Sequence, residues 1–118
     1  MKYLCLVYHE ETKLDALSDV EYEAFVEEDL DYREELRKSG HYLVSSPLQP
    51  VDTATTIRVR HGKLAITGGP NAETKEQLGG FYLIDATDLN DAIRVAAKMP
   101  PARLGSIEVR PLKDIDPT

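Results

Sequence analysis

Two stretches of the chain are apolar at consecutive positions, a pattern typical of strands that are covered on both faces. They are residues 3–8 (YLCLVY) and residues 81–84 (FYLI). Strands of this kind lie in the centre of a sheet. The polar residues 9–15 follow the first of them and are predicted to form a loop that leads to a helix.

More strands are predicted where apolar residues form shorter runs or alternate with polar ones. They are residues 41–46, 55–60, 63–67 and 106–110. The regular alternation along 106–110 is expected at a sheet edge or a half-exposed position. The tight turn at His61-Gly62 predicts that the strands on either side of it form a hairpin, which projects from the main sheet.

Two helices are predicted between these strands. The first begins at Ser18, a good N-cap residue that has Glu21 three positions later to complete a capping box, and it ends at Gly40. The second begins at Thr87 or Asp88. Its apolar residues, largely alanine and isoleucine, recur at the spacing of a helix that packs on a sheet.

The predicted order is β-α-β, hairpin, β-α-β, within a single domain that spans residues 1–118. This is the α+β class, and in a ferredoxin-like sheet the first and third main strands lie side by side in the middle. Those are the two strands with the most apolar sequences. Two helices can cover only one face of such a sheet, so a second subunit, packed sheet against sheet, is expected to cover the other face in a homodimer.

The net charge of −7 is concentrated in one part of the chain. Residues 10–38 carry −8, and the remaining residues carry +1. A solvated helix face is the usual cause of such a run, and an acidic surface argues against nucleic-acid and membrane partners. No segment has the length of a membrane span or the form of a signal peptide, so a cytoplasmic location is expected. The single cysteine, Cys5, is expected to pack as a small hydrophobe.

Asp29 is the first candidate for acid–base chemistry, because it interrupts the apolar stripe of the first predicted helix. A carboxylate there must be paired, hydrated in a cleft, or energetically costly. Desolvation makes a carboxylate a better proton acceptor near neutral pH, so Asp29 is a candidate general base; the alternative is a contact with water or an arginine. His9, at the end of a central strand, could orient or protonate a ligand, or be a surface or structural residue.

The stretch 67–84 (TGGPNAETKEQLGGFYLI) contains two glycine pairs and a polar run that is either solvated or part of a site. Pro70, Glu73 and Lys75 are candidates for a cleft mouth, with Lys75 attracting an anionic group or only balancing its acidic neighbours. Arg103 is a candidate carboxylate clamp, with a structural salt bridge as the alternative. Neither a nucleotide-binding glycine spacing nor a metal-ligand spacing occurs, so no cofactor or metal is expected.

The runs GPNAETKEQLGGFYLIDATDL and PPARLGSIEVRPL, with MKYLCLVY and KSGHYL before them, resemble the DGPF branch of the YCII-related family. The resemblance extends over nearly the whole chain. It implies a dimeric α+β barrel, in which two ferredoxin-like protomers pack their sheets together and each leaves a cleft between sheet and helices. Some relatives in that family are linked to acid–base elimination on small cyclic compounds, and DGPF members are associated with sigma factors of the extracytoplasmic class.

Two positions depart from the pattern of that family. Gly68 and Asn71 stand where the acid and the aromatic residue of the D-G-P-F signature would lie. In the YCII branch proper, a histidine on the first helix is the favoured catalytic group, and counting back from Gly40 places that position near Asp29. A carboxylate there could serve as a base, but without the chemistry of an imidazole.

Two functions are compatible with these observations. The first is a cofactor-independent lyase or isomerase that acts on a small cyclic or anionic metabolite, with Asp29 as base and His9 as acid or orienting group. In it, Arg103 or Lys75 would hold an anionic group of the substrate. The second is a non-catalytic ligand-sensing or protein-interaction module, linked to sigma-factor regulation, that uses the acidic helix as its contact surface.

Overall fold

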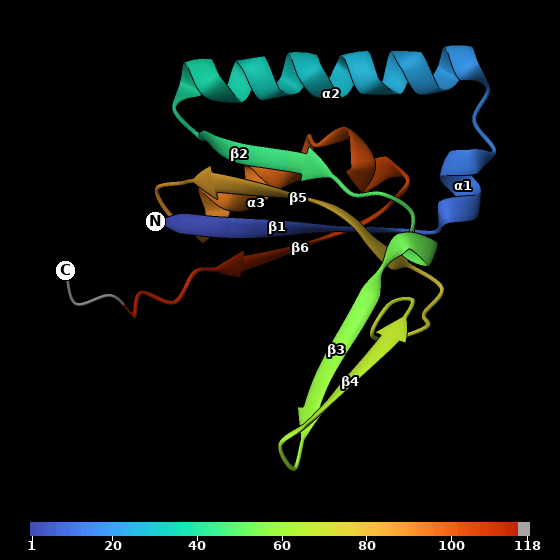
Figure 1. The fold of residues 1–118 in the computed structure, drawn as a ribbon. Helices are drawn as coiled ribbons and strands as arrows, with labels where there is room; N and C mark the ends of the chain where they lie inside the picture. The colour runs from blue at the N-terminus through green and yellow to red at the C-terminus, as the bar shows by residue number, and fades with distance from the viewer. Residues whose placement is uncertain (116–118) are drawn as a thin grey trace.

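The computed structural model describes residues 1–115. Its elements, in chain order, are β1 (Lys2–His9), α1 (Glu11–Asp15), α2 (Asp19–Ser39), β2 (Tyr42–Pro47), the short 3-10 helix η1 (Val51–Thr53), β3 (Thr55–Arg60), β4 (Lys63–Gly68), β5 (Gln77–Asp85), α3 (Leu89–Ala97), the 3-10 helix η2 (Pro100–Arg103) and β6 (Gly105–Pro111). Figure 1 shows this arrangement.

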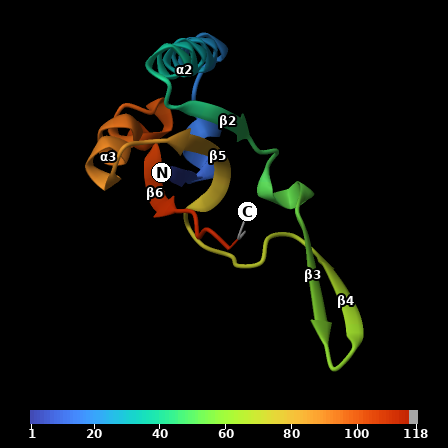
Figure 2. The ribbon, with the colours of Figure 1, turned by 90° about the vertical axis from the view of Figure 1, so that its left-hand side faces the viewer.

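The four main strands form one antiparallel sheet in the order β2-β5-β1-β6. The two strands with consecutive apolar residues, β1 and β5, are its central pair, as predicted. Strands β2 and β6 are the edges. Helices α2 and α3 contribute to the same core on one face of this sheet, which gives the expected α+β, ferredoxin-like protomer (Figures 1 and 2).

The hydrophobic core lies between this face of the sheet and the helices. Alternate residues of the two central strands point into it: Tyr3, Cys5 and Val7 of β1, and Tyr82 and Ile84 of β5. The other members come mainly from the segment around α3: Leu36, Ala86, Ala92, Val95, Ala96 and Met99. Cys5 is fully buried, as expected of a small hydrophobe, and burial raises the pKa of its thiol to about 11.

The predicted helix boundaries are confirmed. The Ser18 hydroxyl accepts a hydrogen bond from the backbone N–H of Glu21, and the Glu21 carboxylate accepts one from the Ser18 N–H, so the capping box is complete. Gly40 ends α2 in the left-handed conformation, with φ of 82°. For α3, Asp88 is the N-cap, since its carboxylate accepts from the Asp91 N–H.

The opposite face of the main sheet carries a second set of apolar side chains, which are only half-buried: Leu4, Leu6, Tyr8, Phe81 and Leu83. None of the helices in residues 1–115 contributes to a core on this face. We call it the open face. It is the surface that a second subunit is expected to cover, and the homodimer stays a prediction.

Strands β3 and β4 form a separate two-stranded sheet, and Figure 1 shows it extending away from the main sheet, as predicted. Both residues of its turn have positive φ, 52° at His61 and 74° at Gly62. Glycine adopts this conformation without strain, which explains why the turn falls where it does.

Two parts of the chain differ from the prediction. Residues 11–15, predicted as loop, form the short helix α1, which has no side-chain N-cap and therefore leaves little trace in the sequence. Strand β5 begins at Gln77 rather than at residue 81, because the glycine-containing segment before the apolar run also pairs with β1. The second half of the glycine-rich stretch is thus sheet, not loop.

Candidate functional site

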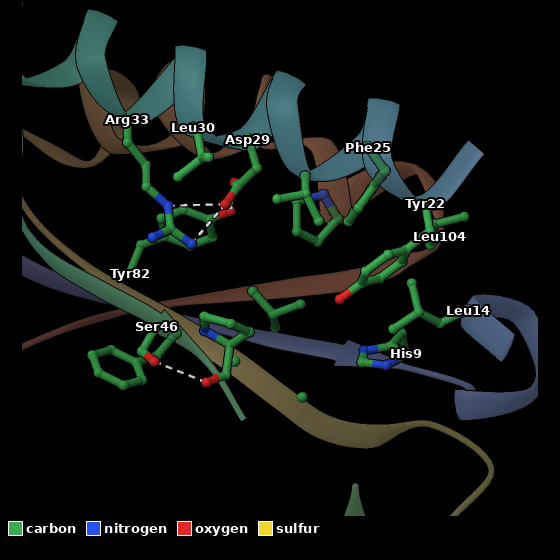
Figure 3. Close-up of a pocket in the computed structure, with 17 residues that line it drawn as sticks. His9, Leu14, Tyr22, Phe25, Asp29, Leu30, Arg33, Ser46, Tyr82 and Leu104 are labelled. Atoms are coloured by element: carbon green, nitrogen blue, oxygen red, sulfur yellow. Dashed lines mark hydrogen bonds and ion pairs between the residues drawn. The ribbon is translucent and has the colours of Figure 1, made fainter. Parts of the chain in front are cut away.

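A cavity of about 130 Å³ lies between α2 and the main sheet. Most of its wall is apolar and comes from β1, α1, α2 and the segment after η2: Val7, Leu14, Tyr22, Phe25, Leu30 and Leu104. Figure 3 labels five of these side chains, Leu14, Tyr22, Phe25, Leu30 and Leu104, around the space. Among them stand a few polar groups, including the two residues predicted to carry the chemistry, Asp29 and His9.

Asp29 points from α2 toward the sheet and is 8% exposed. Its Oδ2 atom accepts from Arg33, one turn later, at 2.9 Å from Nε and 2.7 Å from Nη2. Its Oδ1 atom accepts a hydrogen bond from the Tyr82 hydroxyl of β5. Of the possibilities open to an acid on this stripe, the structure therefore shows a paired carboxylate with both oxygens bonded (Figure 3).

Tyr82 and Arg33 complete a polar cluster at this end of the cavity. Burial raises the pKa of the Tyr82 hydroxyl far above its ordinary value, and the hydrogen bond to Asp29 adds to the effect. The Arg33 guanidinium lies 6.0 Å from the centre of the Tyr82 ring. Arginine has five N–H donors, and Asp29 engages the Nε and Nη2 atoms, so Nη1 is not needed for this ion pair.

His9 lines the cavity from the end of β1 (Figure 3). Its position depends on a register shift between Val7 and Tyr8, opposite which Gly79 is left unpaired in the ladder between β1 and β5. A Cβ atom at Gly79 would lie 2.0 Å from His9 Cε1, so the imidazole occupies the space that any other side chain there would need.

On the other side, Gly105 of β6 supports the same segment. A Cβ atom at Gly105 would lie 1.9 Å from the Tyr8 carbonyl oxygen and 2.9 Å from His9 Cα. The two glycines thus let neighbouring strands approach β1 closely where His9 enters the cavity.

The other predicted site residues lie elsewhere. Arg103 forms a bidentate ion pair with Glu28 on the surface, with distances of 2.8 Å from Nη1 to Oε1 and 2.7 Å from Nη2 to Oε2. Lys75 lies 3.5 Å from the Glu10 carboxylate, and Glu73 is exposed. Pro70 lines a different cleft, at the base of the hairpin. None of these four residues lines the cavity beneath α2.

The sequence matches a known family over almost its full length. Residues 1–116 match the YCII-related domain. The chain belongs to the YCII-related family. An uncharacterized protein of Rhizobium meliloti (strain 1021) is 37% identical to it over 114 residues, which are 95% of this chain and 92% of that protein.

A solved structure shares the fold of this YCII-related chain. It is 5-chloro-2-hydroxyhydroquinone dehydrochlorinase from Burkholderia phenoliruptrix AC1100, in complex with 2,5-dihydroxybenzoquinone. The TM-score is 0.54, over 96% of this chain and 94% of that chain, with 18% sequence identity. At that identity the similarity concerns the fold alone.

The sequence allowed for an arginine beside Asp29 in this YCII-related protein, but neither Arg33 nor Tyr82 was named as part of the site. Arg33 follows Asp29 by four positions, and this spacing places acid and base on one helix face, so the pair was readable. Tyr82 stood in an apolar strand, and its pairing with Asp29 joins residues 53 positions apart in the chain. Only the tertiary structure could show that contact.

A second polar cluster joins α2, β2 and α3 outside the cavity. His41 bonds Ser39 Oγ through Nδ1 at 2.6 Å and Asp91 Oδ2 through Nε2 at 3.0 Å. The Thr87 N–H donates to the same Asp91 oxygen, and these bonds lower the pKa of Asp91 to about 2. The Ser39 hydroxyl also donates to the carbonyl of Leu36, so this cluster ties the end of one helix to the start of the other.

No group of three or more His, Cys, Asp or Glu side chains within residues 1–115 is placed to hold a metal ion. In the same residues, no helix combines the length and the apolarity needed to cross a membrane.

Proposed function

We propose that the protein is a cofactor-independent acid–base enzyme, of the lyase or isomerase type, that acts on a small ring compound bound beneath α2. The observation that carries this proposal is the cavity itself. It is apolar over most of its wall, yet it brings His9 and the cluster of Asp29, Arg33 and Tyr82 to the same space. Apolar cavities with a few convergent polar groups are the usual form of small-molecule sites.

The size of the cavity limits the substrate. Its volume is about 130 Å³, and an apolar cavity of about 150 Å³ in another protein holds benzene. The enclosed space is therefore of the order of a single ring, and we propose a ligand of that size, with its substituents toward the open side of the cavity.

The polar cluster supports recognition of an acidic ring hydroxyl or another anionic oxygen. The Arg33 side chain is 17% exposed and lines the cavity, so its guanidinium can meet a ligand while it stays paired with Asp29. A charge-assisted hydrogen bond from arginine to an oxyanion is among the stronger polar contacts in proteins. Phenolate and quinone oxygens are the ring substituents that fit this role.

His9 is the group that we propose moves the proton, since an imidazole both accepts and donates near neutral pH. In an elimination, it takes a proton from the ring, the freed electron pair forms a new double bond, and the leaving anion departs with its own bonding pair. Asp29 as proton acceptor, the role predicted from its place on α2, requires the carboxylate to be released by Arg33.

The structural neighbour supports the choice of substrate class. Its name describes a dehydrochlorinase of a chlorinated hydroxyhydroquinone, and its structure contains a dihydroxybenzoquinone. Both are single rings with acidic oxygens, which agrees with the ligand size and the polar groups of the cavity described above. The sequence runs that resemble the DGPF branch lead us to place the chain in that branch of the family.

The test is turnover of chlorinated and hydroxylated hydroquinones and of small lactones, followed by chloride release and ultraviolet absorbance. We expect at least one ring compound to be turned over, and His9→Asn to lower kcat by about 10²-fold or more. Asp29→Asn separates its two roles: a rise in KM fits substrate positioning, and a fall in kcat of similar size to that of His9→Asn fits a base.

His61→Asn is the matched control, because it makes the same substitution in the turn of the hairpin, outside the cavity. We expect it to leave kcat within a few-fold of the wild type. Full activity of His9→Asn would contradict the proposal. Tight binding of ring compounds without turnover would favour the ligand-sensing module instead.

We also propose that two chains form a homodimer through the open face. Five apolar side chains there, Leu4, Leu6, Tyr8, Phe81 and Leu83, stand in the centre of the sheet and are only half-buried. A second copy would bury them against an identical surface, as a two-fold interface requires. Light scattering at micromolar concentration is expected to give twice the chain mass, and a monomer would contradict this part of the proposal.

A further inference from the structure

The projecting hairpin of β3 and β4, residues 55–68, has one apolar face and one polar face, and we call it the arm. Its apolar face consists of two cross-strand pairs, Ile57 with Ile66 and Val59 with Leu64. These four side chains are 58–64% exposed. The polar face carries Arg58, whose guanidinium donates to Asn71.

An arm of this kind needs a surface to pack on. A two-stranded hairpin alone is marginally stable at best in water, because one sheet without a covering layer buries little apolar area. In Figures 1 and 2 the arm extends away from the body of the protein. None of its apolar residues belongs to the hydrophobic core. The occupant of its apolar face therefore comes from outside the chain.

The chain exposes more surface than a compact monomer of its mass, and the excess is about the area that a dimer would bury. A compact monomer of this mass exposes roughly 6,400 Å², whereas this chain exposes 8381 Å². Its radius of gyration is 16.3 Å, compared with about 13.5 Å for a compact domain of the same length. The excess, about 2,000 Å² per chain, lies in the range that each partner of an obligate homodimer buries.

The apolar face of the arm continues into the open face of the sheet. A cleft of about 1000 Å³ lies at the base of the arm. Ile57 of the arm lines it, as do Tyr8 and Leu78, which pair with each other across β1 and β5. The wall of this cleft also carries polar side chains, among them Gln49, Thr74 and Gln77, so a partner seated on the open face meets a mixed apolar and polar surface where the arm begins.

The arm and the rest of the chain carry charges of opposite sign, which favours contact between an arm and the body of a partner over contact between two arms. The arm carries +3 and no acid, so the chain's net charge of −7 leaves −10 for the rest. Two arms facing each other would repel, whereas an arm that lies along residues 10–38 of another chain, which carry −8, meets a surface of opposite sign.

We infer that the arm clasps a second copy of this chain, with its apolar face packed on the body of the partner. This inference rests on the sheet-to-sheet homodimer proposed above, which sets the position of the partner. It adds a second interface, between the arm and the partner, to the one formed by the open face. Each chain then gives one arm and receives one, as two-fold symmetry requires.

The test is the dimer dissociation constant, measured by sedimentation across a dilution series. Ile57→Thr combined with Ile66→Thr keeps two β-branched residues in the strands and removes apolar area from the arm. We expect this variant to raise the dissociation constant at least tenfold. Ala65→Thr, on the polar face of the same strand, is the matched control and is expected to leave it unchanged.

A photo-crosslinking side chain in place of Val59 gives the second readout, and it is expected to yield covalent dimers on irradiation, with much less product from position 58. A wild-type dimer whose dissociation constant is the same with the altered arm would overturn the inference and leave the open-face dimer intact. A monomeric wild type would overturn both. Crosslinks from position 58 equal to those from position 59 would also contradict the arm's role.

Discussion

Helices α2 and α3 face the same side of the sheet but differ in how many of their residues are buried against it. Helix α3 has nine residues, of which four are buried, Asp91, Ala92, Val95 and Ala96. Helix α2 has 21 residues, of which only Asp29 and Leu36 are buried. The shorter helix thus seals the core, while the longer one encloses a cavity.

The side chains at the contact explain this difference. Alanines one turn apart, Ala92 and Ala96, let the backbone of α3 come close to the sheet. At the equivalent spacing on α2 stand Asp29 and Arg33, which pair with each other and line the cavity. Apolar residues beside them stay partly exposed, 36% at Val26 and 52% at Leu30. On this face of α2, polar residues line a cavity at positions where α3 has buried alanines.

The largest expected effect breaks the close packing of α3. Ala92 is fully buried, so Ala92→Leu must push α3 from the sheet, and we expect a loss of about 3 kcal/mol of unfolding free energy. Ala24→Leu makes the same change at an exposed position of α2 and is expected to cost less than about 0.5 kcal/mol. Urea denaturation measures both, and equal losses would contradict the contrast between the helices.

The next prediction concerns the cavity that α2 leaves open. Gly79→Ala places a methyl group where the His9 ring lies, so the imidazole must turn away. We expect kcat/KM to fall by roughly 10²-fold, as small displacements of a reacting group do. Gly68→Ala, where a Cβ meets nothing within 4 Å, is the control and should keep full activity. Normal activity of Gly79→Ala would show that the position of His9 does not matter.

A third prediction concerns Asp91, the buried acid of α3. The pKa of Asp91 falls from its ordinary value of 3.8 to about 2 in the folded state, through its bonds to the Thr87 N–H and to His41. Its ionised form therefore stabilises the fold above pH 3.8, and this contribution is lost as the pH falls toward 2. Unfolding measured from pH 2 to 6 should show wild type and Asp91→Asn converging below pH 4. A constant difference between them would contradict this assignment.

The smallest expected effect compares the helix starts. Ser18→Ala removes the capping box of α2, and Asp88→Ala removes the cap of α3. Each is expected to cost about 1 kcal/mol. Because α2 has few buried residues, hydrogen exchange should increase near its first turn in Ser18→Ala, while α3 stays protected in Asp88→Ala. Equal exchange in both helices would show that packing does not hold α3 in place.

Local signals allowed most of the fold to be predicted. The capping box at Ser18, the left-handed Gly40 and the turn at His61-Gly62 each act within a few residues, so their sequences determine their structures. The apolar runs gave the central strands for the same reason. The short helix α1 was missed because it has no side-chain cap. The start of β5 was missed because Gly79 and Gly80 have no side chains to continue the apolar pattern of the strand.

The site was only partly readable. Asp29 stood out because an acid interrupted an apolar stripe, and His9 because it ended a central strand. Arg103 and Lys75 were chosen for their charge, but whether a surface cation meets a ligand or a neighbouring acid depends on tertiary contacts, here with Glu28 and Glu10. Tyr82 could be found only through the packing of α2 on β5.

The central claim is that a single ring with acidic oxygens binds between α2 and the sheet. Its most direct test is a crystal structure of the protein soaked with 2,5-dihydroxybenzoquinone. The account predicts the ring inside the cavity, with one oxygen within hydrogen-bond distance of Arg33 and another facing His9. A ring bound elsewhere, or a cavity that stays empty at saturating concentration, would contradict it.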